Sequence, residues 1–301
     1  MAVTRTKSDA TYQTATFAVP SPMVDDAAAL LIAWGALGCA VERVSRAGRP
    51  RGPVANLQAW FKRIAPAELA RIHHKLRDLR MIAGDVPQLS NLTDPGWATM
   101  WMDRFKPLPI GLRLTILPPW ETATTASTVH DDGRVGLIIR PGQGFGTGHH
   151  PTTAGALVAL EDICKRTPPR DALDVGTGSG VLAIAMRLYG VKRVVAIDND
   201  PAALENAREN AALNQISGLR FSLARVETFR RRLDLVTANI LSSTLIRMAP
   251  TLCRLVNRDG RLILGGILAR ERSAVLKHYG PPMRLIRSRI DRGWATLVLG
   301  R

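Results

Sequence analysis

The sequence has little of several residue types, and each shortage narrows the classes of protein to which the chain can belong. Only three of its 301 residues are cysteines (Cys39, Cys164 and Cys253), and no two of them form a Cys-x-x-Cys pair. This spacing excludes a disulfide-stabilised scaffold and a zinc site built from cysteines, and it fits a reducing compartment. No apolar run approaches the roughly 20 residues that a membrane-spanning helix needs, and the first 20 residues lack the apolar core of a signal peptide. We therefore expect a cytoplasmic protein with no membrane segment and no metal.

Acidic residues are also scarce relative to basic ones. The chain has 41 Lys and Arg against 25 Asp and Glu, a formal net charge of +16, and residues 151–301 carry most of this excess. A field of this size attracts nucleic acids and ribonucleoprotein particles. However, arginine outnumbers lysine 34 to 7, which equally suits a genome-wide compositional preference. The charge fits a contact with nucleic acid or a ribonucleoprotein particle, but it does not select a function.

Length and hydrophobic patterning indicate two domains. A chain of 301 residues with 46% hydrophobic residues is longer than one small domain and can bury more than one core. Residues 1–95 follow a β-α-β-β-α order, which predicts a small α+β domain of the ferredoxin-like type. Strands are expected at 14–19, 39–44 and 54–61, and helices over 27–34 and 66–79.

The remainder of the chain separates into a connector and an α/β domain. Residues 96–140, rich in proline and tryptophan, are expected to be a connector. Residues 141–301 alternate between strands and helices, a pattern typical of a doubly wound, mostly parallel sheet of the Rossmann-like type. Its seven strands are expected at 172–175, 193–197, 219–223, 233–238, 261–264, 285–289 and 294–299. The short gap at 291–293 predicts that the last two form an antiparallel hairpin at one edge.

The strongest local signal is a glycine-rich turn that follows the first of these strands and opens a helix. Glycines at 176, 178 and 180 give Gly-x-Gly-x-Gly, and position 181 is Val. A dinucleotide site favours Gly-x-Gly-x-x-Gly instead, whereas the spacing here is typical of S-adenosylmethionine sites. Glycine lets the backbone approach a ligand closely. The alternative is a tight turn with a purely structural role.

Polar residues end two further strands of this sheet. Asp198 follows its strand 22 residues after Gly176, where a carboxylate can accept bonds from both hydroxyls of a ribose. Helix capping is the competing role, which we assign to Asp200 because it directly precedes Pro201.

Asn239 ends a later strand and is followed by Ile240. Its side-chain oxygen and the neighbouring backbone carbonyl can accept two bonds from one amine and so orient the nitrogen lone pair. A turn-forming asparagine is the simpler alternative.

A glycine-rich loop at 141–149 lies before the helix that contains Thr152 and Thr153. Four glycines make this loop able to cover a ligand. A metal site at His149 and His150 is disfavoured, because adjacent side chains point apart and no third ligand has a suitable spacing. A general base is conceivable from the pKa of histidine.

Taken together, these segments resemble one family. The loop GFGTGHHPTT, the turn at 174–180, the run DNDP from Asp198 and the sequence ANIL around Asn239 are similar to the bacterial methyltransferases of ribosomal protein eleven of the large subunit. The connector motifs FKPL and IG and the ending Gly293-Trp294 agree. The resemblance covers nearly the whole chain and is densest over 97–241. It departs from the family at Gly144, Ser242 and Gly265.

The resemblance implies a fold, a cofactor and a set of site residues. Residues 141–301 would form a class I methyltransferase domain that uses S-adenosylmethionine, and the first domain would recognise the ribosomal protein. Asn239 would face the target amine and be the catalytic residue, with Phe145 and Thr147 close to the methyl group. Cofactor contacts would be Thr153, Gly176, Gly178, Asp198 and Asn239. No acid follows the third strand of the sheet, so the adenine contact is unassigned.

The implied function is N-methylation of lysine or α-amino groups of that ribosomal protein. Methylation of ribosomal RNA, or of a lysine in a different protein, is the alternative, and it is favoured by the basic charge. A nicotinamide-dependent oxidoreductase is disfavoured by Val181. A non-catalytic ribosome-binding module is disfavoured by the intact motifs.

Overall fold

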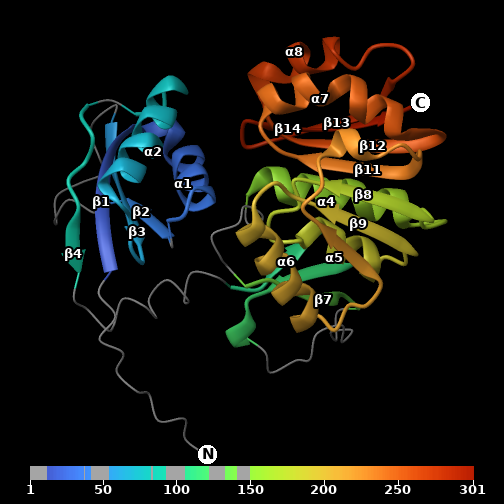
Figure 1. Cartoon of the computed structure of the whole chain (residues 1–301), viewed down its shortest axis with the longest axis horizontal. Helices are drawn as coiled ribbons and strands as arrows, with labels where there is room; N and C mark the ends of the chain where they lie inside the picture. The colour runs from blue at the N-terminus through green and yellow to red at the C-terminus, as the bar shows by residue number, and fades with distance from the viewer. Residues whose placement is uncertain are drawn as a thin grey trace, which may run out of the picture. The chain divides into compact units, whose positions relative to one another are not determined.

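A computed structural model describes residues 12–36, 38–41, 54–82, 84–92, 106–121, 133–140 and 150–301. The chain divides into two compact units, whose described residues lie within 12–92 and 106–301 (Figure 1). Each unit has a hydrophobic core of its own.

The first unit is a four-stranded antiparallel sheet that packs against two helices. Its strands lie in the order β2-β3-β1-β4. Alternate side chains of β1, namely Ala15, Phe17 and Val19, are buried against the helices, as expected for a sheet with one covered face. The elements are β1 (Tyr12–Pro20), α1 (Val24–Ala33), β2 (Gly38–Val41), β3 (Val54–Phe61), α2 (Pro66–Asp78) and β4 (Ser90–Leu92). The strands predicted at 14–19 and 54–61 and both predicted helices are present, and the strand predicted at 39–44 is present over 39–41, while residues 42–44 lie outside the described residues.

The second unit is built on the predicted seven-stranded sheet, which is confirmed. Its strand order is β10-β9-β8-β11-β12-β14-β13, and only the pairs that involve β14 are antiparallel. The strands are β8 (Asp171–Val175), β9 (Arg193–Ile197), β10 (Leu219–Ser222), β11 (Leu233–Asn239), β12 (Val256–Leu268), β13 (Arg284–Asp291) and β14 (Trp294–Gly300). The β13–β14 hairpin occupies one edge, as the short gap at 291–293 predicts.

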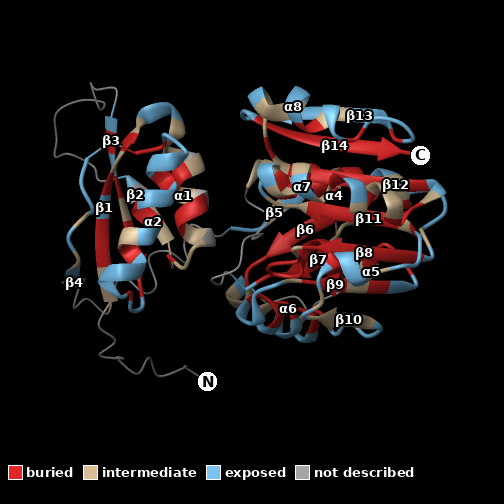
Figure 2. Ribbon diagram, turned by 45° about the horizontal axis from the view of Figure 1, so that its top comes forward, coloured by how far each residue is buried: buried red, intermediate tan, exposed pale blue. Residues whose placement is uncertain are grey.

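Helices cover both faces of this sheet. One core cluster contains residues of α4 and α5 with Ala211 of α6, and the other contains residues of α7 with Val275 of α8. Successive strand residues therefore enter different clusters, and β14 is buried along its whole length (Figure 2). The helices are α4 (Pro151–Cys164), α5 (Val181–Leu188), α6 (Pro201–Leu213), α7 (Ser242–Leu255) and α8 (Arg272–Lys277).

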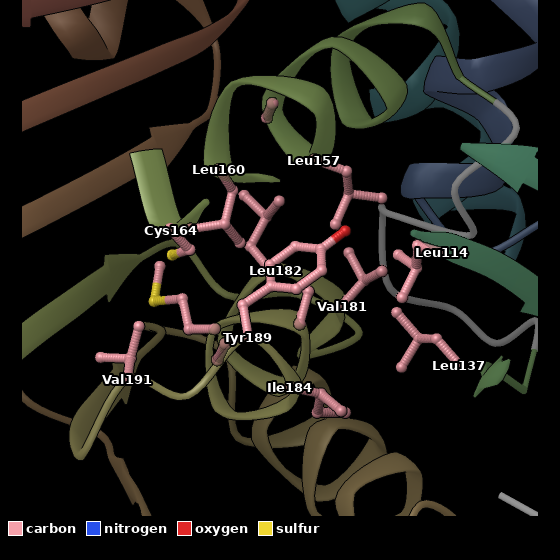
Figure 3. Packing of buried hydrophobic residues seen from close by; sticks show 14 of the residues in the cluster. Leu114, Leu137, Leu157, Leu160, Cys164, Val181, Leu182, Ile184, Tyr189 and Val191 are labelled. Atoms are coloured by element: carbon pink, nitrogen blue, oxygen red, sulfur yellow. The ribbon is translucent and has the colours of Figure 1, made fainter. Parts of the chain in front are cut away.

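Three short strands precede the glycine-rich loop and pack within the second unit. They are β5 (Leu108–Ile110), β6 (Leu114–Leu117) and β7 (Val135–Ile138), and they form a separate sheet. Leu114 and Leu137 lie in one cluster with Leu157 of α4 and Val181 of α5 (Figure 3). The division into 1–95, 96–140 and 141–301 stays a prediction, but the described part of its middle segment shares a core with the α/β sheet.

A buried carboxylate fixes the β5–β6 turn to α4. Both oxygens of Glu161 accept the backbone N–H of Leu112 at 3.1 Å, and one also accepts that of Arg113 at 3.2 Å. Glu161 is 6% exposed, and these bonds offset the free energy of burying its charge. Gly111, at φ +57°, leaves the space that the carboxylate fills, because a Cβ there would overlap it.

Candidate active site

Three neighbouring strands bring the predicted site residues to one edge of the sheet. β8 pairs with β9 and with β11 in parallel, and Val175 lies opposite both Ile197 and Ala238. Gly176, Asp198 and Asn239 follow or end these strands, so they meet at the carboxyl ends. In open α/β sheets this is where ligands bind.

The glycine turn has a backbone that only glycine adopts without strain. Gly176, Gly178 and Gly180 have φ values of +70°, +55° and +81°. A Cβ on Gly176 would overlap the Ile240 side chain, and one on Gly180 would lie 3.0 Å from Cβ of Ala207 in α6. The turn is therefore packed tightly between β11 and α6, which keeps its N–H groups in place.

Asp198 organises this turn and the start of α6. Its carboxylate accepts the N–H of Gly178 at 2.9 Å and that of Asp200 at 3.1 Å. The predicted capping role of Asp200 is confirmed, since Asp200 is the N-cap of α6 and accepts the N–H of Ala202 at 2.8 Å. The ribose contact of Asp198 stays a prediction. Asp198 is only half-buried, and a carboxylate has acceptor positions beyond these two bonds.

Asn239 places a buried acceptor at the same edge. Its Nδ2 donates to Oγ1 of Thr153, at 3.3 Å, in the first turn of α4. Its Oδ1 is buried and has no hydrogen-bond partner within the described residues. A buried acceptor without a donor costs about 1–3 kcal/mol. An amine N–H brought to this oxygen would satisfy it.

Two consecutive glycines of β12 make room for the acceptors at this corner. A Cβ on Gly265 would overlap Oδ1 of Asn239, and a Cβ on Gly266 would overlap the carbonyl of Ile240. The pairing of β12 with β14 shifts register between Leu264 and Ile267, which marks a bulge at the glycines. The absence of a side chain at Gly265 therefore has a structural effect in this chain, because it leaves the space that the Asn239 oxygen occupies.

Asp174, at the end of β8, is a buried carboxylate to which the sequence analysis assigned no role. It accepts hydroxyl bonds from Thr177 at 2.7 Å and Thr237 at 2.6 Å. Burial raises the pKa of Asp174 to about 6, although both hydroxyls act to lower it. Its contacts join the glycine turn to β11 below the site.

Two asparagines that the sequence analysis missed, Asn210 of α6 and its C-cap Asn214, attach this helix to the glycine turn and to the end of β7. Asn210 donates to the carbonyl of Ser179 and accepts the N–H of Arg140, both at 2.9 Å. Asn214 accepts the N–H of Ile138 at 2.8 Å and donates to its carbonyl. Both asparagines are fully buried. Asn at i and i+4 in an alanine-rich helix is the only signal of these contacts in the sequence.

His150 is the N-cap of α4. Its Nδ1 lies 2.8 Å from Oγ1 of Thr152, and its ring packs edge-on against Trp294 at 4.6 Å between centroids. Burial, with a smaller contribution from Arg292, lowers the pKa of His150 to about 4. A lowered pKa makes this imidazole a weak base, and its Nδ1 is engaged in the helix cap, so both observations argue against the general-base role. His149, Phe145 and Thr147 lie outside the described residues, and no group of metal-ligating side chains occurs within them.

The buried state of His150 predicts a specific pH dependence of stability. The imidazole is protonated below about pH 6.5 when unfolded but only below about pH 4 when folded. The unfolded state therefore binds more protons in this window, so this group's contribution to stability is lost as the pH falls. Between pH 7.5 and 4.5, the wild type should lose about 2–3 kcal/mol more than His150→Asn, which keeps a capping side chain.

Urea unfolding at the two pH values measures this difference. Parallel pH profiles for the wild type and His150→Asn would contradict a neutral, buried His150.

Comparison with known proteins gives a consistent result. The family model described as "Ribosomal protein L11 methyltransferase (PrmA)" matches residues 11–301. Curated proteins named ribosomal protein L11 methyltransferase from Azotobacter vinelandii and Pseudomonas aeruginosa are each 39% identical, over 80% and 71% of both chains respectively.

A solved structure is similar as well. The ribosomal protein L11 methylase of Lactobacillus delbrueckii subsp. bulgaricus is 29% identical, with a TM-score of 0.58 over 65% of this chain and 98% of that one. Among the helices that the structure describes, none combines the length and the apolar character that crossing a membrane requires.

Proposed function

Because the chain belongs to the ribosomal protein L11 methyltransferase family, we propose that it transfers methyl groups from S-adenosylmethionine to lysine or α-amino groups of ribosomal protein L11. We place this activity in the cytoplasm. The observation that carries the proposal is the buried Oδ1 of Asn239, which has no partner among the residues that the structure describes and lies at the strand ends beside the glycine turn.

The residues at this edge fit S-adenosylmethionine. Asp198 has free acceptor capacity for the two ribose hydroxyls. Gly176 and Gly178 keep the turn open to close approach of a ligand. Thr153 accepts a hydrogen bond from the Asn239 amide and so fixes its orientation. S-adenosylmethionine supplies a methyl group on a positively charged sulfur.

The protein's own contribution is to hold an uncharged amine in line with that methyl group. A lysine has an unperturbed pKa near 10.4 and an α-amine near 8, so either must lose a proton before it attacks. A neighbouring positive charge and removal from water both lower an amine's pKa. Oδ1 of Asn239 and the carbonyl of Ile240 would accept the remaining N–H bonds and direct the lone pair, which is catalysis by orientation.

We assign recognition of the protein substrate to the first unit. Its β-α-β-β-α-β order and its strand order β2-β3-β1-β4 support the ferredoxin-like assignment. This unit has none of the predicted cofactor residues, all of which lie in the second unit. Residues 96–140 would connect the two.

Incubation with radiolabelled S-adenosylmethionine tests the proposal. Purified L11 and protein-free ribosomal RNA are offered separately, and mass spectrometry counts the methyl groups. We expect label on L11 amines and none on RNA. Label on RNA alone would support the alternative that the net charge of +16 suggests, and label on neither would contradict methyl transfer to this substrate.

A further inference from the structure

The positive charge of the second unit is concentrated on the side opposite the candidate site. We define the amino edge as the edge where the parallel strands β8–β12 begin, together with the helix ends next to it. Its residues are 162–171, 187–193, Arg220, 230–234, 254–261, 277–284 and Arg301. The C-terminus, marked in Figures 1 and 2, lies at this edge because β14 ends beside Arg261.

The charges of the amino edge can be compared with those of the rest of residues 151–301. The comparison distinguishes a locally basic surface from a uniform preference for arginine. Of the 24 Lys and Arg in residues 151–301, the amino edge holds sixteen, against four of the 13 Asp and Glu. The remaining eight basic and nine acidic residues nearly cancel. A genome-wide preference for arginine would raise the basic content of both sets of residues alike, so it does not account for this distribution.

The acidic residues of the amino edge are mostly engaged. Asp171 forms ion pairs with Arg193 and Arg231. Asp234 accepts the N–H groups of Arg170 and Asp171 and the amide of Asn257. Three exposed cations, Arg232, Arg258 and Lys277, form no ion pair with any acid in the described ranges. These charges are available to an external anion.

Two hollows lie between the basic side chains. One, of about 530 Å³, is lined by Arg232, Arg254, Lys277, His278 and Arg301 and by no acidic side chain. The other, of about 960 Å³, lies on the opposite face of the sheet and has a mixed lining, with four arginines (Arg170, Arg258, Arg261 and Arg287) and three aspartates (Asp162, Asp234 and Asp259). Arginine presents a planar fork of donors that matches a phosphate group. Because the two hollows lie on opposite faces of the sheet, a single ligand that contacts both would need several phosphate groups.

The composition of the hollows indicates how a nucleic acid would be recognised. Neither lining contains Phe, Tyr or Trp. Proteins that bind single strands usually stack the bases on such rings, whereas duplex RNA is bound largely through its backbone and shape. The surface therefore fits the phosphates of a duplex, without sequence preference.

We propose that the amino edge binds the phosphate backbone of double-helical RNA. The candidate active site lies at the opposite edge of the sheet, where the parallel strands end. The choice of RNA rests on the proposed function, because a ribosomal protein is the substrate. Backbone binding itself uses no residue of the methyl-transfer site. An RNA-bound enzyme would therefore keep its active edge accessible to a protein.

Fluorescence anisotropy of the full chain with a labelled 20-base-pair RNA duplex tests this proposal, over 50 to 200 mM salt. We expect the triple variant Arg232→Glu, Arg258→Glu, Lys277→Glu to bind at least tenfold more weakly at 100 mM salt. The slope of log affinity against log salt should become shallower by about 2–3, because each lost phosphate contact contributes just under one unit. Methylation of free L11 by this variant should be unchanged.

The matched control is Arg247→Glu, Arg270→Glu, Arg289→Glu, which changes the net charge equally at exposed positions outside the amino edge. We expect less than a threefold loss of affinity. Equal losses of affinity in both triple variants would show that only total charge matters, and this result would overturn the proposal. The proposal would also be overturned if the protein did not bind the RNA duplex, including the case in which it bound DNA or polyglutamate instead. Thermal unfolding checks that both triple variants fold. If the amino-edge triple variant does not fold, the single variants Arg232→Glu and Arg258→Glu are measured in its place. The binding assay contains no methyl donor, so its result is independent of the proposed methyl transfer.

Discussion

Asn239→Ala is expected to lower kcat for methyl transfer by about 100- to 1,000-fold, the range found when a single orienting group is removed from an active site. The substitution deletes the buried oxygen that would accept the amine, together with the donor to Thr153. The fold should survive, because the lost bond to Thr153 is one of many contacts of β11. Calorimetry should show a change in S-adenosylmethionine affinity that is smaller than the change in kcat.

Asn257→Ala provides a matched control for Asn239→Ala. It removes an amide that donates to Asp234 at the amino edge, far along the strands from the site. Its kcat should stay within about twofold of the wild type. If Asn239→Ala turned over at the wild-type rate with an intact fold, the assigned role of Asn239 would be wrong.

Asp198→Ala should weaken binding of S-adenosylmethionine by about 10- to 100-fold. A hydrogen bond to a charged group contributes about 1.5–3 kcal/mol, and 1.4 kcal/mol corresponds to a factor of ten in affinity. The variant also loses the bond that holds Gly178 in the turn, which acts in the same direction. Titration calorimetry measures the affinity directly.

The neighbouring Asp200 separates ligand binding from helix capping. Asp200→Ala removes the N-cap of α6 and should cost about 1 kcal/mol of stability, with affinity unchanged within threefold. Equal affinity losses in the two variants would mean that Asp198 acts only through the local fold.

Much of this architecture follows from short-range pattern. The strand predicted at 54–61 has those bounds in the structure, and the strands that precede Gly176 and Asp198 lie within one residue of prediction. Apolar runs bounded by turn residues specify such strands locally. The glycine spacing and the cap at Asp200 are equally local, and so they could be read from the sequence.

The contacts that sequence reasoning missed join residues far apart in the chain. Glu161 binds a turn 49 residues earlier, and Asn214 binds Ile138 across 76 residues. No periodicity encodes such pairings, because each depends on how separate elements pack. The space beside Asn239 is a similar case, since it depends on Gly265 of a neighbouring strand.

Asn210 of α6 and the C-cap Asn214 also limit how the chain can change in length. Asp200 fixes where this helix begins, and Asn210 and Asn214 must then project toward β7 and Ser179. One inserted or deleted residue between position 200 and position 210 would turn the later part of the helix by about 100° and break both attachments together. Evolution can therefore vary the composition of this stretch much more freely than its number of residues.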